Sequence, residues 1–288
     1  TALVSDPAVL ADSVFGVDSR TDEGSQADSG RCIGLVVTRA GIFKDNGIDF
    51  NEADQRRFWL DVISRLEARG DDYRIFTTGH FSDEMFLDSL VRHHGVPNKK
   101  AAVTLNAPEE LIAELQKCDG VIAYRLHASI TSFALGIPSI GLNWNFKVPD
   151  FYRSMGYPER ALEDSDWNAA TVLRALDAAM SEGVSKDPDK LMSVYRTLFS
   201  GLKGIIAPGS DAEAYSLSEL REKMPTYTGT SRKQYQEKMR RKLRRSYEYY
   251  QQRISMDVAK TEKIGAASDN SRSGLRRLKS SLKRALNR

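Results

Sequence analysis

The chain has 288 residues, of which 41% are hydrophobic and 28% are charged, and its formal net charge at pH 7 is +3. This balance is that of a globular protein, and it excludes collagen-like, disulfide-scaffold and wholly disordered chains. No apolar run approaches the ~18 residues that a membrane-spanning helix needs, and the presence of just two cysteines, Cys32 and Cys118, favours a reducing, cytoplasmic compartment.

Five short apolar segments predict buried strands, and the amphipathic segments between them predict helices. The strands are expected at residues 33–38, 73–78, 101–105, 120–124 and 138–142. The helices are expected at residues 51–69, 82–94, 108–117 and 127–135, the second with Ser82 as its N-cap. Because strands and helices alternate, we predict an α/β fold with a doubly wound parallel sheet, which binds ligands at the carboxyl ends of its strands.

The composition changes along the chain and predicts four parts. Residues 1–30 end in a linker rich in Asp, Ser and Gly, and residues 31–206 are expected to form the α/β lobe, with two further helices between residues 164 and 203. Residues 207–230 are rich in Pro, Gly, Ser and Thr and are expected to be a connector. Residues 231–288 are expected to be a basic helical tail.

The tail carries a charge opposite to that of the rest of the chain. From residue 229 to residue 288 there are 18 Lys and Arg against 5 Asp and Glu, whereas the other 228 residues have 24 basic and 34 acidic groups. One long helix is expected over residues 232–263, and residues 275–286 carry a second apolar stripe flanked by Lys and Arg. This pattern is typical of a helix that lies on an anionic membrane surface, with a solvated or self-associating extension as the alternative. Nucleic-acid binding is not expected, because no recognition motif accompanies the charge.

Polar and basic side chains follow four of the predicted strands. The candidates are Arg39 after the first strand, Gly79 and His80 after the second, the triplet Arg125, Leu126 and His127 after the fourth, and Asn143, Trp144, Asn145 and Lys147 after the fifth. Because the carboxyl ends of parallel strands meet at one edge of a sheet, we expect these residues to line one cationic crevice. The N-terminus of the helix expected at residues 127–135 adds partial positive charge. Such a site suits an anionic small molecule with phosphate and carboxylate groups.

The triplet that begins at Arg125 is the strongest of these candidates. It joins an apolar strand to an apolar helix, so Arg125 and His127 are expected at a poorly solvated junction, where an unpaired charge is costly. Simpler interpretations exist for Arg39, as a surface ion-pair partner, and for His80, as a turn residue. No carboxylate pair is expected at this edge, which argues against glycosidase chemistry. The sequence shows no pattern of metal ligands, so neither a metal nor a resident cofactor is expected.

A segment around this triplet carries a family resemblance. The stretch VIAYRLHASITSFALGIPSIGLNWNFKVPDFYRSMGY resembles the C-terminal signature of the polysaccharide pyruvyl transferases, in which an Arg-x-His leads into a helix, a Gly-x-Pro turn follows, and a Lys comes after the next strand. Here these residues are Arg125, His127, Gly136, Pro138 and Lys147. The GLVVTR and FTTGHFSDEMF segments and the early Asp-Pro-Ala are also similar to the family, so the resemblance covers about residues 1–165.

The resemblance implies a fold, a reaction and a donor substrate. The fold is a Rossmann-like lobe of a GT-B-like protein, and residues 1–15 are expected to be the end of an otherwise missing N-terminal lobe. The reaction is transfer of a pyruvyl group from phosphoenolpyruvate to two hydroxyls of a sugar, in a polysaccharide or its lipid-linked precursor, which forms a cyclic ketal. The resemblance places Arg39, Arg125, Leu126 and His127 around phosphoenolpyruvate.

Roles within this expected reaction follow from the chemistry of each group. His127 and Arg125 are the predicted catalytic residues, because His127 suits general acid–base chemistry near neutral pH. Arg39 and Arg125 suit the donor's two anionic groups, and Lys147 suits the departing phosphate. Further substrate contacts are predicted from Gly79, His80 and Asn143, and His80 is the alternative proton donor.

Two other functions compete with this interpretation. The first is a nucleotide-sugar glycosyltransferase of GT-B type. Retaining enzymes of that type commonly have two glutamates where this chain has Ala123 and Thr131, which argues against a retaining enzyme. The absence of these glutamates does not argue against an inverting enzyme. The second is a non-catalytic module that binds polysaccharide or a partner enzyme. The expected location is the cytoplasm, with peripheral attachment at the inner face of the membrane through residues 231–288.

Overall fold

The structure is a computed structural model that describes residues 5–17, 30–224, 227–249, 251–252 and 255–256. The chain forms two compact units, Thr1–Tyr235 and Gln236–Arg288. In the second unit the described backbone is helical. The linker expected at residues 18–29 and the stripe expected at residues 275–286 lie outside the described residues. Within the described ranges, no helix has the length and apolar character needed to cross a membrane.

The first unit is built on a parallel sheet of six strands. In chain order they are β1 (Cys32–Val36), β2 (Asp72–Phe76), β3 (Ala101–Ala102), β4 (Gly120–Ala123), β5 (Ser139–Leu142) and β6 (Ala161–Leu162). Their order across the sheet is β3-β2-β1-β4-β5-β6, and every pair is parallel. The prediction of a doubly wound parallel sheet is therefore confirmed. The expectation that residues 138–142 form the last strand is wrong, because the two-residue strand β6 pairs with β5 and is too short to show a sequence period.

The main helices lie close to their predicted positions. Between strands these are α3 (Glu52–Ala68), α4 (Phe81–His93), α5 (Pro108–Leu115) and α6 (Leu126–Ala134), and after the last strand they are α8 (Ala169–Glu182) and α9 (Pro188–Ile206). Asn51 caps α3 through the backbone N–H groups of residues 53 and 54, as expected for an Asn at this position. The N-cap of α4 is His80, two residues before the predicted cap Ser82, and the helix begins at Phe81.

Several shorter elements were not predicted. They are η1 (Pro7–Leu10), α1 (Ala11–Phe15), α2 (Gly41–Asp45), η3 (Asn98–Lys100), α7 (Lys147–Met155), η4 (Pro158–Arg160), η5 (Asp164–Asp166) and α10 (Leu217–Lys223). The last of these lies inside the expected connector, where Ser216 caps it and Leu220 is buried. Short helices of this kind depend on caps and tertiary packing more than on a repeated apolar period.

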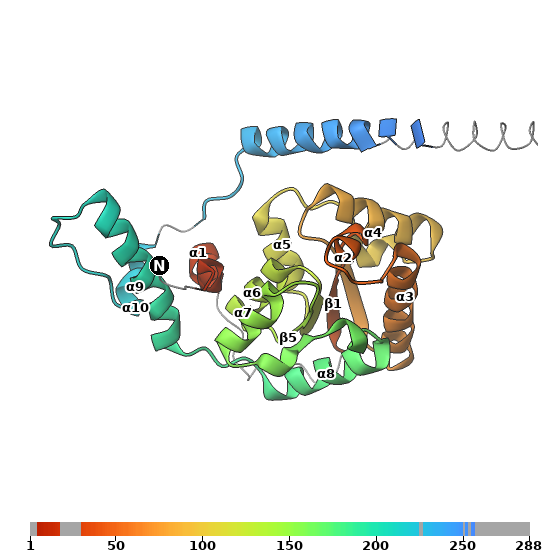
Figure 1. Cartoon of the computed structure of the whole chain (residues 1–288), viewed down its shortest axis with the longest axis horizontal. Coiled ribbons are helices and arrows are strands. Elements are labelled where there is room, and N and C mark those ends of the chain that lie inside the picture. Colours follow the sequence, from red (N-terminus) through yellow and green to blue (C-terminus); the bar gives the residue numbers. More distant parts are fainter. Residues whose placement is uncertain (1–4, 18–29, 225–226, 250, 253–254, 257–288) are drawn as a thin grey trace, which may run out of the picture. The chain divides into compact units, whose positions relative to one another are not determined.

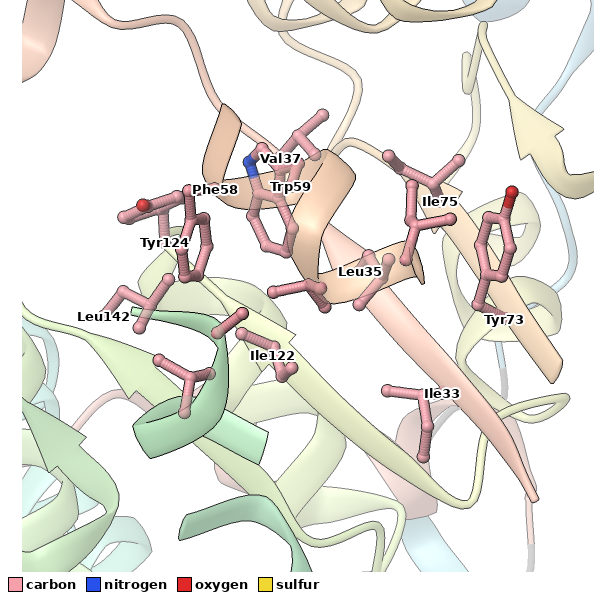
Figure 2. Packing of buried hydrophobic residues seen from close by; sticks show 14 of the residues in the cluster. Ile33, Leu35, Val37, Phe58, Trp59, Tyr73, Ile75, Ile122, Tyr124 and Leu142 are labelled. Atoms are coloured by element: carbon pink, nitrogen blue, oxygen red, sulfur yellow. The ribbon is translucent and has the colours of Figure 1, made fainter. Parts of the chain in front are cut away.

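Helices cover both faces of the sheet. The residues of β1 alternate, so Ile33, Leu35 and Val37 pack with α3, α4 and α8, whereas Val36 packs with α5 and α6 on the other face. Figure 1 shows α3 on one side of β1 and α5 and α6 on the other. Figure 2 shows the first face, where Trp59 of α3 lies over β1. This burial on both faces explains the continuous apolar character of the strands.

A second group of buried residues places the N-terminal segment and α7. Val9 and Leu10 of η1 pack with residues of α6, α7, α9 and α10. Helix α7 approaches β5 very closely at Gly141, where a Cβ atom would lie 2.5 Å from a ring carbon of Tyr152 and 2.6 Å from a methyl group of Val148. A side chain at position 141 would push α7 away from the sheet. The loop between β5 and α7 is thus held at both of its ends.

An ion-pair cluster at the amino-terminal edge of the sheet makes stability depend on pH. Burial raises the pKa of Asp71, but hydrogen bonds from Arg31 (3.0 Å) and Arg69 (2.9 Å) outweigh it, so the net pKa lies below the ordinary carboxyl value. A lowered folded-state pKa gives a stabilisation that is complete above the ordinary value of about 4 and is lost as the pH falls through the lowered one.

We therefore expect Asp71→Asn to lower Tm by about 2–4 °C at pH 7 and by much less at pH 2. Differential scanning calorimetry at both pH values measures this. The control is Asp61→Asn, because the Arg65–Asp61 pair is about half exposed on α3 and should contribute little at either pH. Equal losses for Asp71→Asn at pH 7 and pH 2 would show that charge is not the cause.

Candidate functional site

The carboxyl edge of the sheet carries the candidate residues on both sides of a topological switch point. The strand order reverses at β1, since the chain passes from β1 outward to β2 and β3 and then returns to β4 on the other side. Arg39 follows β1, and Arg125 follows β4 as the N-cap of α6. Open α/β sheets bind ligands in the crevice at such a point. The two predicted arginines therefore come from the two strands that flank the expected ligand position.

A turn after β2 brings a third strand end into this edge. Gly79 has φ +81°, in the left-handed region that favours glycine, and its N–H donates to Oγ1 of Thr77 at 3.0 Å. The turn makes His80 the N-cap of α4 and places Asp83 in the first turn of that helix. Asp83 is completely buried, whereas the His80 side chain is 41% exposed.

Asp83 joins three strand ends through one carboxylate. Arg125 donates two hydrogen bonds to it, from Nε to Oδ2 and from Nη2 to Oδ1, each at 2.8 Å. The Thr38 hydroxyl and the Arg39 backbone N–H also donate to Oδ1, at 3.2 and 3.0 Å. Nδ1 of His80 lies 3.8 Å from the same oxygen. The buried carboxylate thus fixes the direction of the Arg125 guanidinium and the course of the chain after β1.

A side chain of helix α3 also holds the segment between β1 and Arg39. Gln55 is fully buried, and its Nε2 donates to the carbonyl oxygen of Thr38 at 2.6 Å. Thr38 is therefore held by Gln55 on its carbonyl side and by Asp83 on its hydroxyl side. Because its carbonyl and its hydroxyl are both hydrogen-bonded to buried side chains, Thr38 fixes the backbone that leads into Arg39.

His127 lies on the outer side of this edge and pairs with the N-terminal segment. Its Nε2 is 3.5 Å from Oδ2 of Asp6, and the two side chains are 69% and 37% exposed. Asp6 is held in place because its other oxygen accepts from the N–H of Ala8 at 2.9 Å, as the cap of η1. The expectation of a poorly solvated junction is thus met by Arg125, whose side chain is 21% exposed, and is wrong for His127.

The remaining candidates are spread along the β4 and β5 side of the edge. The side chain of Leu126 packs into the second buried cluster, so the group that α6 can offer a ligand at this position is the backbone N–H. Nδ2 of Asn143 donates to Oε2 of Glu163 at 2.9 Å, and Nε1 of Trp144 donates to the Tyr124 carbonyl at 2.6 Å. Lys147 is exposed as the first residue of α7.

Carboxylates reduce the positive charge that was expected at this edge. Asp83 neutralises Arg125 and Asp6 faces His127, so the expectation of an unopposed cationic crevice needs correction. In the described part of the chain, the guanidinium of Arg39 and the ammonium of Lys147 have no hydrogen-bond or ion-pair partner. These two groups are therefore the ones most available to an incoming anion, while Arg125 is already oriented by Asp83.

Comparison with known proteins assigns the segment that carries this cluster. A family model for polysaccharide pyruvyl transferases matches residues 1–145. The chain belongs to the polysaccharide pyruvyl transferase family. The match includes Asp6, Arg39, Asp83, Arg125 and His127, and ends two residues before Lys147.

Two other comparisons, with curated proteins and with solved structures, give no further information on function. No curated protein matches the chain. A solved structure from Listeria monocytogenes, assigned as a UDP-N-acetylglucosamine 2-epimerase, is similar with 13% sequence identity and a TM-score of 0.43. The similarity covers 73% of this chain and 57% of that protein, so the chain spans little more than half of its length.

Three supporting residues of this pyruvyl transferase family member were missed by the sequence reasoning. They are Asp83, Thr38 and Gln55. Asp83 stands three residues after His80 in TTGHFSDEMF, and a helix start at residue 81 would have placed it in the first turn, where a carboxylate is favoured. With Ser82 as the cap, Asp83 would also lie in the first turn, and such a position does not by itself indicate a contact with Arg125. Thr38 and Gln55 carry no sequence signal, because their role depends on the packing of α3 against the end of β1.

Proposed function

We propose that the chain transfers the pyruvyl group of phosphoenolpyruvate to two hydroxyls of a sugar, in a polysaccharide or its lipid-linked precursor, and so forms a cyclic ketal. The observation that supports this best is the pair of arginines at the switch point, within the segment that matches the family. The Arg39 guanidinium has no partner among the described residues, and Arg125 is fixed by Asp83. Phosphoenolpyruvate has a carboxylate and a phosphate, and guanidinium groups bind both through charge-assisted hydrogen bonds.

The chemistry assigns a task to each group. Protonation of the donor's methylene carbon creates an oxocarbenium-like centre, to which a sugar hydroxyl adds and gives up its proton. Inorganic phosphate then leaves with the electron pair of its C–O bond, which creates a second oxocarbenium-like centre. A second hydroxyl adds to that carbon, gives up its proton and closes the ketal. His127 is exposed, so a substrate can reach it, and the Asp6 carboxylate lies beside its ring. Both features suit a general acid–base group. Lys147 is available for the phosphate, and His80 is the alternative proton donor.

The direct test incubates the full-length protein with phosphoenolpyruvate and a panel of nitrophenyl and lipid-linked sugars. The expected product is a sugar whose mass has increased by one pyruvate less one water, together with one inorganic phosphate per ketal. Arg125→Ala should form both products far more slowly. Consumption of a UDP-sugar instead of phosphoenolpyruvate would favour the glycosyltransferase alternative. Sugar binding without turnover of either donor would favour the non-catalytic module.

We also propose that the basic tail attaches the protein to an anionic membrane surface. The described helix over residues 232–249 has eight Lys and Arg against two Glu, a net charge of +6. Leu243 and Tyr247 lie one turn apart on it and are 65% and 66% exposed. Apolar groups flanked by basic residues suit a helix at a lipid interface, where each cation contributes up to about 1 kcal/mol near anionic lipid. A lipid-linked acceptor would give this attachment a purpose.

The structure sets where a tail deletion can begin. Residues 227–235 belong to the first unit: the Tyr227 N–H donates to the Val14 carbonyl at 2.7 Å, the Thr230 N–H donates to Glu109 at 2.8 Å, and Tyr235 accepts from Asn106 at 3.1 Å. A deletion should therefore begin after Tyr235, because an earlier cut removes these contacts.

Deletion of residues 236–288 is expected to reduce co-sedimentation with phosphatidylserine-containing vesicles at least tenfold and to leave phosphoenolpyruvate binding unchanged. A full-length variant with Arg→Gln at positions 240, 241, 244 and 245 should show part of the same loss, because it removes four of the eight basic groups of residues 232–249. Vesicles of phosphatidylcholine alone are the control. Undiminished binding to anionic vesicles, or a loss of RNA binding in its place, would reject the membrane proposal.

A further inference from the structure

The loop between β5 and α7 exposes an aromatic ring at the same edge as the candidate site. The Phe146 side chain is 72% exposed, more than any other aromatic side chain in the described part of the chain. Phe146 follows β5, and β5 lies next to β4 in the sheet. The ring therefore belongs to the carboxyl edge that carries Arg125 and Arg39. Exposing an aromatic ring to water is unfavourable, so a ring that is held outward is a candidate for contact with a ligand.

Three contacts hold this loop in place. Trp144 packs against the main core and donates from Nε1 to the Tyr124 carbonyl at 2.6 Å. Tyr124 directly precedes Arg125, so this bond joins the loop to the strand end that carries the fixed arginine. On the other side, Oδ1 of Asn145 accepts from the Lys147 N–H at 3.0 Å, and the Asp150 N–H donates to the Phe146 carbonyl at 3.3 Å.

Both ends of the loop are thus fixed, one by Trp144 and one by the first turn of α7. Helix α7 packs directly on β5, because Tyr152 and Val148 lie against Gly141, which has no side chain. Phe146 lies between these anchors as the N-cap residue of α7, and its side chain is exposed. The contacts of its neighbours therefore determine where the ring is presented.

We propose that Phe146 is a stacking platform for the pyranose ring of the acceptor, and that residues 144–146 form the acceptor subsite. This inference rests on the proposed pyruvyl transfer and names the residue that binds its second substrate. The face of an aromatic ring carries partial negative charge, and the C–H groups on one face of a pyranose are apolar and slightly positive. A flat ring gains little from the anionic donor, whose partners are the guanidinium groups.

A neighbouring side chain suits the same ligand. Asn145 directly precedes Phe146, and its side-chain NH2 group can donate to the hydroxyls at the rim of a sugar whose face is on the ring. Because the Trp144 indole is bonded to the residue before Arg125, the loop and the donor cluster belong to the same edge of the sheet. The proposal therefore places both substrates at this edge.

The test compares Phe146→Ala with Phe146→Trp and with Ile205→Ala, a control at an 81% exposed apolar position at the end of α9. All three changes are at exposed side chains and should leave Tm unchanged. Phe146→Ala is expected to raise the acceptor KM about tenfold, because it loses most of the apolar area that the sugar covers. The KM for phosphoenolpyruvate should stay within twofold of the unchanged protein. Phe146→Trp should restore the acceptor KM, and Ile205→Ala should have no effect.

A binding measurement separates this inference from the proposed reaction. Saturation-transfer NMR with methyl pyranosides, without phosphoenolpyruvate, should show transfer to ring C–H protons that is lost in Phe146→Ala. Binding that depends on Phe146 in a protein that forms no ketal would support the subsite and reject pyruvyl transfer. No pyranoside binding by the unchanged protein, or equal binding by Phe146→Ala, would overturn the subsite. A change in self-association with unchanged sugar binding would also overturn it, in favour of a contact with a second copy of the chain.

Discussion

Asp83→Ala is expected to lower kcat/KM for phosphoenolpyruvate by about 10² to 10³-fold. The Asp83 carboxylate is completely buried and accepts hydrogen bonds from Arg125, Thr38 and the Arg39 backbone. Its removal leaves the Arg125 guanidinium without a partner in a largely buried position, which costs about 3–5 kcal/mol unless the side chain moves. Whether the guanidinium stays unpaired or moves, Arg125 loses the orientation that Asp83 gives it. Steady-state kinetics on the purified variant measure the loss.

A double-mutant cycle distinguishes positioning through Arg125 from a general loss of structure. If Asp83 acts through Arg125, Asp83→Ala should have little further effect on kcat in an Arg125→Ala background. The double variant should also be more stable than Asp83→Ala alone, because no unpaired charge remains. Asp88→Ala is the matched control on α4, since Asp88 pairs with Arg92 at the surface. Additive losses of kcat in the cycle would show that Asp83 does not work through Arg125.

The fold could be predicted because its strands are buried on both faces. A short continuous apolar run such as residues 33–37 is typical of a central strand in a parallel sheet. The helices between such runs have a clear apolar face. The parts that could not be predicted are those without a period. Strand β6 has two residues, and α7 is a short helix whose position depends on the close approach at Gly141.

The candidate site was predictable for residues that immediately follow a strand and not for those that act across space. Arg39 and Arg125 could be placed at one edge because strand ends in a parallel sheet must converge. The charge balance of the edge could not be predicted, because Asp83 reaches it from the first turn of α4 and Asp6 from a segment 121 residues before His127. Pairing of buried charges is a property of the folded chain, and it changes which cations remain free for a ligand.

Arg39→Ala is expected to weaken phosphoenolpyruvate binding by about 10- to 100-fold, measured as the dissociation constant by calorimetry and as KM in turnover. Arg39 follows the strand at the switch point, and its guanidinium has no partner within the described residues. A ligand that it binds therefore does not compete with an existing ion pair, so the full strength of a charge-assisted contact, about 1.5–3 kcal/mol, is available to the donor.

Substitution by lysine tests the geometry of this contact. Arg39→Lys keeps the charge but lacks the planar fork, so it should recover only part of the affinity. Stability should not change in either variant, because the contact with Asp83 is made by the backbone N–H of residue 39 and not by its side chain. Arg153→Ala is the control, as Arg153 is 67% exposed and pairs with Asp150 on α7. Full recovery by lysine would mean that the site binds the donor by charge alone, and unchanged affinity in Arg39→Ala would remove Arg39 from the donor site.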